Sequence, residues 1–365
     1  MADYIARKAK IGFWHKLNFG STGDIGVGTT TAANYTLLME PEKIAGNKPT
    51  VSREEYQLTS AQGLIAERAR SFTDAQSSLH HVKLGGVAIR EQLPLLFFLA
   101  LFKAAETDYT VPNPDNYQQV FTFFAKDSLP DFTNPYEPEG NSNPNVSPPL
   151  AIIAIDETGT TGSELVDVYS DCIVDTLDFS VNPNAQGTAR FAQVDCTFAA
   201  GYHDGYPTSG DLTFPTPPAV VPYNNQNAFA FSITDAITYS GCFKEFRLTI
   251  NNNVTSDCKT TGGRPTNLRV SPEAQIEFSL PYNSTTQALK NKFVEGTEAT
   301  IKLSTGTTGQ LGFLEIEGKG ALINLETAIE NNVWVLKGTL KCEQPASGEA
   351  LKVTMCSLTQ LIDVA

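Results

Sequence analysis

The chain has little positive charge and carries no spacing typical of a metal site. Its 365 residues include 26 Lys or Arg against 40 Asp or Glu, for a net charge of −14. Ordinary DNA binding needs Lys and Arg to neutralise phosphates, so this composition disfavours it. The six cysteines form no C-x-x-C pair and do not cluster with the four histidines, which argues against zinc. We expect reduced, small and buried side chains at all six, namely Cys172, Cys196, Cys242, Cys258, Cys342 and Cys356.

Long apolar segments are also lacking. Residues 1–10 contain no apolar stretch and no cleavage site, so the sequence does not indicate secretion and we expect the protein to assemble in a cytoplasm. The longest apolar run, 93–102, is about half the length needed to span a bilayer and contains Pro94. It is interpreted as a buried helix, and no membrane partner is expected.

Signatures of catalysis are missing as well. The sequence contains no G-x-S-x-G, no G-x-x-x-x-G-K-[ST] and no G-x-G-x-x-G. The glycine-rich segment 20–28 matches a phosphate-binding loop only in glycine density, and a flexible arm is the favoured interpretation. His80 and His81 are adjacent, so on a strand they point to opposite faces and cannot chelate one ion. We therefore expect no enzymatic activity, no cofactor, and no catalytic, cofactor-binding or metal-binding residues.

The negative charge is concentrated in one part of the chain. Residues 101–180 hold fourteen Asp or Glu against Lys103 and Lys126, and the remainder is close to neutral. One interpretation is a solvated acidic surface that favours solubility. The other is a surface past which nucleic acid moves without adhering.

What the sequence does contain is strand-like alternation that occurs twice. Residues 174–182 and 243–251 match in class at nearly every position, and related strands follow at 193–198 and 275–280. The pattern predicts that one face of each strand is buried and the other wet. The predicted buried set is Leu177, Phe179, Val181, Phe246, Leu248 and Ile250.

Helices and other strands complete a mainly β prediction. We expect strands at 79–89, with a bulge or bend at Gly85 and Gly86, and at 118–125 and 333–342. A helix apolar on nearly all sides is predicted over 92–105, and a short amphipathic helix over 285–295. Residues 299–303 and 311–317 are expected to form a hairpin.

The domain organisation expected from these elements is a tandem of two β modules. Residues 1–50 form an N-terminal arm or long loop, 51–201 the first module, 202–227 a Pro- and Gly-rich linker, and 228–365 the second module. Two alignments of the halves compete. One pairs residue 174 with 243, and the other pairs the strand–helix–strand units near 82 and 275.

Short patterns in both halves resemble the tail tube (major tail) proteins of long-tailed, non-contractile bacteriophages, in a tandem-module form. In the first half they are 86–90 followed by the apolar helix, then 117–124, 128–133 and 171–181. In the second half they are 242–252, 263–265 and 274–280 with Leu289, Phe293 and Gly296. The likeness covers roughly 80–345.

That resemblance implies β-sandwich or barrel-like tube modules, each with one flanking helix, in stacked rings around an acidic channel that delivers DNA. A two-module chain would close the ring as a homotrimer with pseudo-sixfold symmetry. The implied location is the virion, and the implied partners are further copies, the tape measure, distal tail and terminator proteins, and passing DNA. Asp178 is a candidate for the channel wall, although Arg247 at the matched position argues against a uniformly acidic ring. Contacts between rings are expected at the arm, the 126–150 loop and the linker.

Two other functions stay open. The chain could form a single ring, as a distal tail or tail-terminator protein does. It could also be a surface-displayed β-rich binding or adhesive protein, against which the absence of a signal peptide counts. A hydrolase is the weakest alternative.

Overall fold

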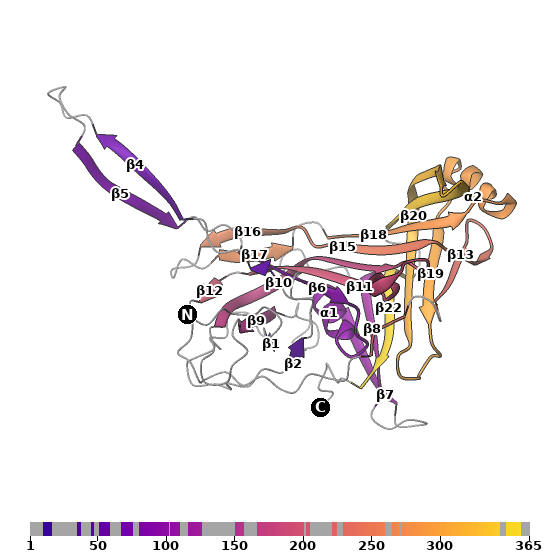
Figure 1. The fold of residues 1–365 in the computed structure, drawn as a ribbon, viewed down its shortest axis with the longest axis horizontal. Coiled ribbons are helices and arrows are strands. Elements are labelled where there is room, and N and C mark those ends of the chain that lie inside the picture. Colours follow the sequence, from indigo (N-terminus) through magenta and orange to yellow (C-terminus); the bar gives the residue numbers. More distant parts are fainter. Residues whose placement is uncertain are drawn as a thin grey trace.

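A computed structural model of the chain describes residues 10–16, 35–37, 45–46, 51–58, 67–75, 80–101, 103–109, 116–125, 150–156, 166–200, 202–204, 221–224, 229–259, 265–269, 272–343 and 348–358. This part of the chain is mainly β, as predicted, with two α-helices, α1 (Leu93–Ala100) and α2 (Ser284–Val294) (Figure 1).

The strands are arranged along the whole described chain. In the first half they are β1 (Lys10–Lys16), β2 (Tyr35–Leu37), β3 (Ala45–Gly46), β4 (Val51–Leu58), β5 (Glu67–Ala75), β6 (His80–Val87), β7 (Lys103–Tyr109), β8 (Asn116–Ala125), β9 (Leu150–Asp156), β10 (Val166–Val181), β11 (Gln193–Ala200) and β12 (Tyr202–Asp204). In the second half they are β13 (Ala230–Thr234), β14 (Tyr239–Gly241), β15 (Glu245–Asn251), β16 (Val254–Lys259), β17 (Pro265–Arg269), β18 (Glu273–Pro281), β19 (Ala299–Thr305), β20 (Leu314–Glu330), β21 (Val333–Cys342) and β22 (Glu349–Ser357).

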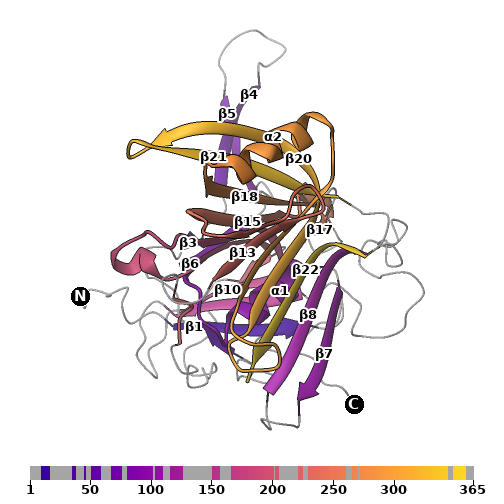
Figure 2. The same cartoon turned by 90° about the vertical axis from the view of Figure 1, so that its right-hand side faces the viewer.

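Eight antiparallel strands form a central sheet in the order β3-β6-β11-β10-β15-β18-β21-β20. A second group of strands, β14-β13-β19-β20-β22-β8-β7, crosses one end of it (Figure 2). A third group, β2-β1-β9-β10-β12, lies at the other end. The pairs β4–β5 and β16–β17 are separate two-stranded hairpins, and β4–β5 projects from the body in Figure 1.

The two longest strands, β10 and β20, join these groups because each changes neighbours midway. Residues 314–320 of β20 pair with β19 and β22, and residues 320–330 pair with β21. Gly320 stands at the change, where an added Cβ would lie 2.0 Å from the Lys341 carbonyl oxygen. Only glycine permits so close an approach of two backbones, so this residue sets the corner between the sheets.

The core lies between the sheets and around α1. All eight residues of α1 are buried, as expected of a helix that is apolar on every side. The Phe97 ring contacts Phe121 on β8 and Phe179 on β10, with centroids 6.5 and 6.3 Å apart. The predicted strand phase is confirmed, because all six residues of the predicted buried set are 0% exposed.

Some boundaries differ from the sequence-based expectations. The first helix ends at Ala100 rather than at 105, because Leu101 is extended and β7 pairs with β8. Of the bulge or bend expected at Gly85 and Gly86, the bulge is not found, since β6 pairs with β11 in one unbroken register. The final strand, β22, has no counterpart among the predicted elements. The 126–149 loop lies outside the described residues.

Segments expected as an arm and a linker take part in the sheets where they are described. Strand β1 pairs with β9 along its full length, although 1–50 was expected to be an arm or loop. At the end of the expected linker, Tyr223 is buried, and its backbone exchanges hydrogen bonds with Ala88 and Ala192.

Both halves of the chain contribute to one hydrophobic core. Strand β10 pairs with β15 across the expected linker, and β8 pairs with β22 over most of its length. The division into two modules therefore stays a prediction about how the chain is organised, and not a separation into independent cores.

Candidate functional surface

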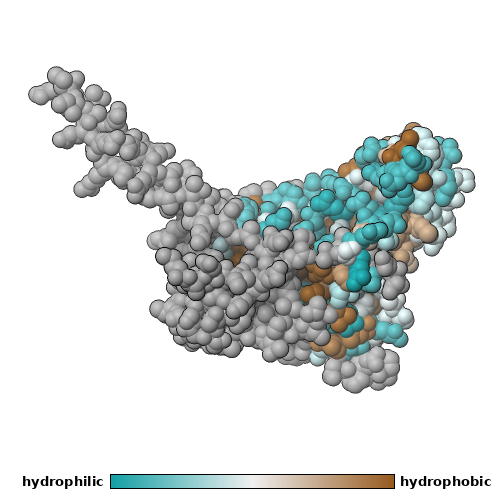
Figure 3. Space-filling view, in the orientation of Figure 1, coloured by the Kyte–Doolittle hydropathy of each residue, from teal (hydrophilic) through white to brown (hydrophobic). Residues whose placement is uncertain are grey.

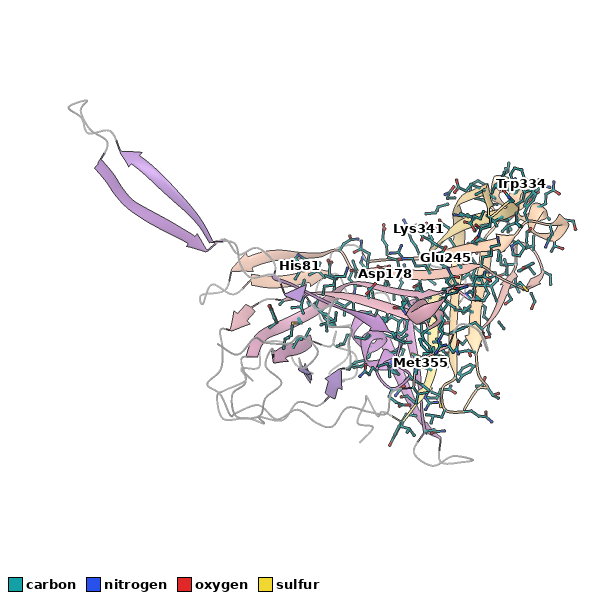
Figure 4. All side chains as sticks on the ribbon, in the orientation of Figure 1. His81, Asp178, Glu245, Trp334, Lys341 and Met355 are labelled. Carbon is teal, nitrogen blue, oxygen red and sulfur yellow. The ribbon has the colours of Figure 1, made fainter. Side chains whose placement is uncertain are left out.

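The face of the central sheet opposite the core is polar along its whole width. Alternation along most of β10, β11, β15, β18 and β21 sends apolar side chains inward and polar ones outward, with Val333 and Val335 of β21 as exceptions. We call the outward side the polar face; its described charged residues are Lys83, Asp178, Asp195, Glu245, Arg247, Glu273, Glu277, Glu326, Glu330, Lys337 and Lys341. Figure 3 shows it as a continuous hydrophilic strip, and Figure 4 labels Asp178, Glu245 and Lys341 along it.

Cross-strand pairs partly neutralise this face. One terminal guanidinium nitrogen of Arg247 lies 3.2 Å from a carboxylate oxygen of Asp178, and the other lies 3.9 Å from one of Glu277. The Thr249 hydroxyl also donates to Asp178 over 2.6 Å. The hydrogen bond to Asp178 raises the pKa of Arg247, so the group stays charged. The Arg247 side chain is 45% exposed, and such a pair contributes less than about 1 kcal/mol to stability.

Two further cations of the polar face, Lys337 and Lys341, also lie near carboxylates. The Lys337 amine lies 2.7 Å from a carboxylate oxygen of Glu330. Its hydrogen bond to this carboxylate raises the pKa of Lys337. Lys341 lies 3.6 Å from Glu273. Carboxylates outnumber cations on this face, so it is mildly acidic overall.

The acidic concentration predicted over 101–180 is only partly visible here. Of its carboxylates, Asp178 lies on the polar face, and Asp175 accepts a hydrogen bond from the Val254 amide over 3.0 Å. The side chains of the others lie outside the described residues. Arg247 beside Asp178 shows that this face is not uniformly acidic.

One open groove lies at the end of the polar face nearest the β20–β21 turn. Its lining is entirely polar: Asn182, Asn184, Lys244, Glu245, Ser279, Glu330 and Asn331. Sites for small organic ligands are mostly apolar with a few convergent polar groups. This groove lacks that apolar wall, and it is better regarded as part of the wet surface.

The cysteines mostly behave as predicted. Cys172, Cys196, Cys342 and Cys356 are buried and free, whereas Cys242 is exposed, contrary to the expectation for all six. Cys242 follows the short edge strand β14, where nothing in the described chain covers it. Burial raises the pKa of the Cys342 thiol to about 12, so it is inert at neutral pH. The Cys258 side chain lies outside the described residues.

No group of three or more His, Cys, Asp or Glu side chains in the described ranges is placed to hold a metal ion. His81 lies on β6 opposite Ala199, and the side chain of His80 is outside the described set. Neither helix of the described chain is long and apolar enough to cross a membrane.

Several exposed apolar residues on α2 and the β20–β21 hairpin were not anticipated from the sequence. They are Val294 at the end of α2 and Ile323, Ile329, Val333 and Trp334 on the β20–β21 hairpin, each between 48% and 85% exposed. Trp334 is labelled in Figure 4. The available signal was the apolar pair Val333-Trp334 directly after the Asn331-Asn332 turn, where polar residues are usual.

Comparisons with known proteins point to one family. The sequence profile described as "Phage tail tube protein" matches residues 24–350 of the chain. A search of curated proteins gives no significant match.

Proposed function

Because the chain belongs to the phage tail tube protein family, we propose that its copies form stacked rings whose inner wall is the polar face of the central sheet. The stacked rings form the tail tube, a conduit through which DNA passes into the host. The family membership supports a structural role in the virion, and no catalytic step is required of any residue.

The observation that carries the proposal is the polar face itself. A continuous antiparallel sheet with one buried and one wet face suits the wall of a channel. Three of its four described cations, Arg247, Lys337 and Lys341, lie beside carboxylates, and the remaining carboxylates repel phosphate. DNA in such a channel would find few free cations to bind, so it could slide.

We propose that three copies complete each ring, with pseudo-sixfold symmetry, in the tail of a non-contractile, long-tailed phage. The further partners are the tape measure protein inside the tube and the distal tail and terminator proteins at its ends. Assembly takes place in the cytoplasm of the host bacterium.

Negative-stain imaging of concentrated purified protein tests this function. The expected result is hollow tubes of uniform bore. Single rings that never elongate, even when seeded with tail tips, would indicate a distal tail or terminator role instead. Protein that stays monomeric and binds glycans would support the adhesive alternative.

A further inference from the structure

The strand pairings of the two halves repeat in the same order. The β1–β2 hairpin pairs onto β9, and the β13–β14 hairpin pairs onto β19 in the same antiparallel sense. The next strands, β3 and β15, pair with β6 and β18. The connections between them are the hairpins β4–β5 and β16–β17, and a helix follows β6 and β18.

The correspondence continues through the long strands. Strand β10 folds back into β11, which pairs with β6; β20 folds back into β21, which pairs with β18. After each hairpin a further strand, β12 or β22, continues along the same long strand. Among the described strands, only β7 and β8 lack a counterpart.

A matched irregularity fixes the correspondence residue by residue. The register between β10 and β11 shifts between Val174 and Thr176, and that between β20 and β21 shifts between Leu322 and Asn324. The strand that pairs with β11 at this level is β6, and the one that pairs with β21 is β18. An irregularity of this kind at the same position in both halves supports a common backbone plan, because β-bulges are kept at fixed positions within families.

We infer that the chain is a structural tandem repeat, β1 to β12 and β13 to β22, whose internal β10–β15 junction is reproduced between neighbouring copies by β20 and β3. The inference rests on the proposed ring and names the surfaces that close it. The first repeat would then begin at β1 rather than at residue 51.

The edges needed for this junction are available. The outer edge of residues 321–330 of β20 carries no strand among the described residues, whereas the equivalent edge of β10 carries β15. At the other end of the central sheet, the described pairing of β3 is to β6 alone. Unpaired strand edges are templates for pairing with another chain.

Residues of the second repeat are more exposed than their counterparts in the first. This difference is expected if the second repeat lacks a neighbouring strand that another copy would supply. Ile329 is 60% exposed, whereas Val181, its counterpart on β10, is 0% exposed. All residues of α1 are buried, whereas on α2 only Thr286 and Leu289 are. The exposed apolar residues thus lie on the elements where the second copy would dock, and burial of apolar side chains there favours a protein partner.

The internal junction also predicts the register between copies. Within the chain, Ser180 faces Arg247 and Phe179 faces Leu248. Arg247 faces Glu277 in the way that Ala45 faces Lys83, so Ala45 is the counterpart of Arg247. Ser180 lies five residues after Asp175, which the register shift leaves unpaired, and Ala328 lies five residues after Ile323, which the matching shift leaves unpaired. Ala328 is therefore the counterpart of Ser180. Ala45 of one copy should therefore lie opposite Ala328 of the next.

Disulfide cross-linking tests this register. Directly opposed residues of antiparallel strands have Cα atoms about 4.5–5.5 Å apart, within the range that a disulfide bridges. The double variant Ala45→Cys/Ala328→Cys would be made with Cys242→Ser, which removes the exposed thiol. Mild oxidation of assembled protein should give covalent species that end at three chains on a denaturing, non-reducing gel. Both single-cysteine variants control for the native thiols.

A control variant with one cysteine shifted by a residue tests whether cross-linking depends on the predicted register or only on the two strands being close. The Ala45→Cys/Thr327→Cys variant shifts one cysteine by a residue and turns it to the other face, so its cross-linking should fall at least tenfold. Imaging of the same samples shows whether rings or tubes are present. Assembled rings without the Ala45–Ala328 cross-link would overturn the inference and leave the tube function standing. Absence of any ring would overturn both.

Discussion

At the residue scale, the alternation of apolar and polar side chains decides which face of the central sheet is core. Phe246 is 0% exposed, whereas Asp178 on the neighbouring strand is on the polar face. Phe246→Asp should abolish folding, because it buries a charge without a partner. Asp178→Asn should leave folding intact, with a loss below about 1 kcal/mol, since its ion pair is solvent-exposed. Circular dichroism and denaturant unfolding would measure both. A soluble, folded Phe246→Asp protein would contradict the strand phase.

A second residue-scale prediction concerns Asn252, which is fully buried after β15. Its side-chain amide donates to the carbonyl oxygens of Ala100, 3.1 Å away at the end of α1, and of Val174, 2.8 Å away on β10. Asn252→Ala leaves both acceptors without this donor and should lower the free energy of unfolding by about 1–3 kcal/mol. The exposed Gln287→Ala on α2 is the control and should change it little. Equal stabilities of the two variants would show that Asn252 does not hold these elements together.

At the scale of elements, the corner in β20 depends on glycine. An alanine Cβ at Gly320 would fall 2.0 Å from the backbone oxygen of Lys341, which cannot move without distorting β21. Gly320→Ala should therefore destabilise the protein by about 1–3 kcal/mol or more. Gly241→Ala is the control, since its nearest neighbour is the Tyr239 hydroxyl at 3.3 Å and the position is exposed. Thermal unfolding of the two variants measures the difference, and a Gly320→Ala protein as stable as the control would contradict the corner.

Elements defined by local periodicity could be predicted from the sequence. The period of two placed β10, β11, β15 and β18 with the correct buried faces, and the unbroken apolar run located α1. Pairing between distant strands leaves no comparable local signal. The sequence therefore did not indicate that β8 pairs with β22, or that β10 and β15 are neighbours. The sequences of β10 and β15 are alike because both are core strands of one sheet. The repeat that we infer from the strand pairings agrees with the alignment of the strand–helix–strand units near 82 and 275.

Surface features were predicted less well, because they depend on what covers a residue. Cys242 and Trp334 are exposed, although their chemistry favours burial. Asp178 and Arg247 were recognised as opposed in charge, but only the sheet register brings them within 3.2 Å.

At the scale of the whole molecule, the charge of the polar face should control how the tube treats DNA. Glu245→Lys/Glu277→Lys replaces two exposed carboxylates by cations on the proposed channel wall. Tubes of this variant should retain short duplex DNA at low salt and release it as salt rises, whereas the unmodified tube should not. Glu298→Lys, an exposed change outside the central sheet, is the control. A binding assay at several salt concentrations measures the effect, and equal retention by all three proteins would show that the charge of the polar face does not control DNA binding.

The central claim is that copies of this chain close a hollow ring with the polar face inside. It is tested most directly by averaging end-on electron-microscope images of the assembled protein. We expect an open bore, three chains of 39.5 kDa per ring and a pseudo-sixfold outline. A filled rod, or rings of six complete chains, would contradict it.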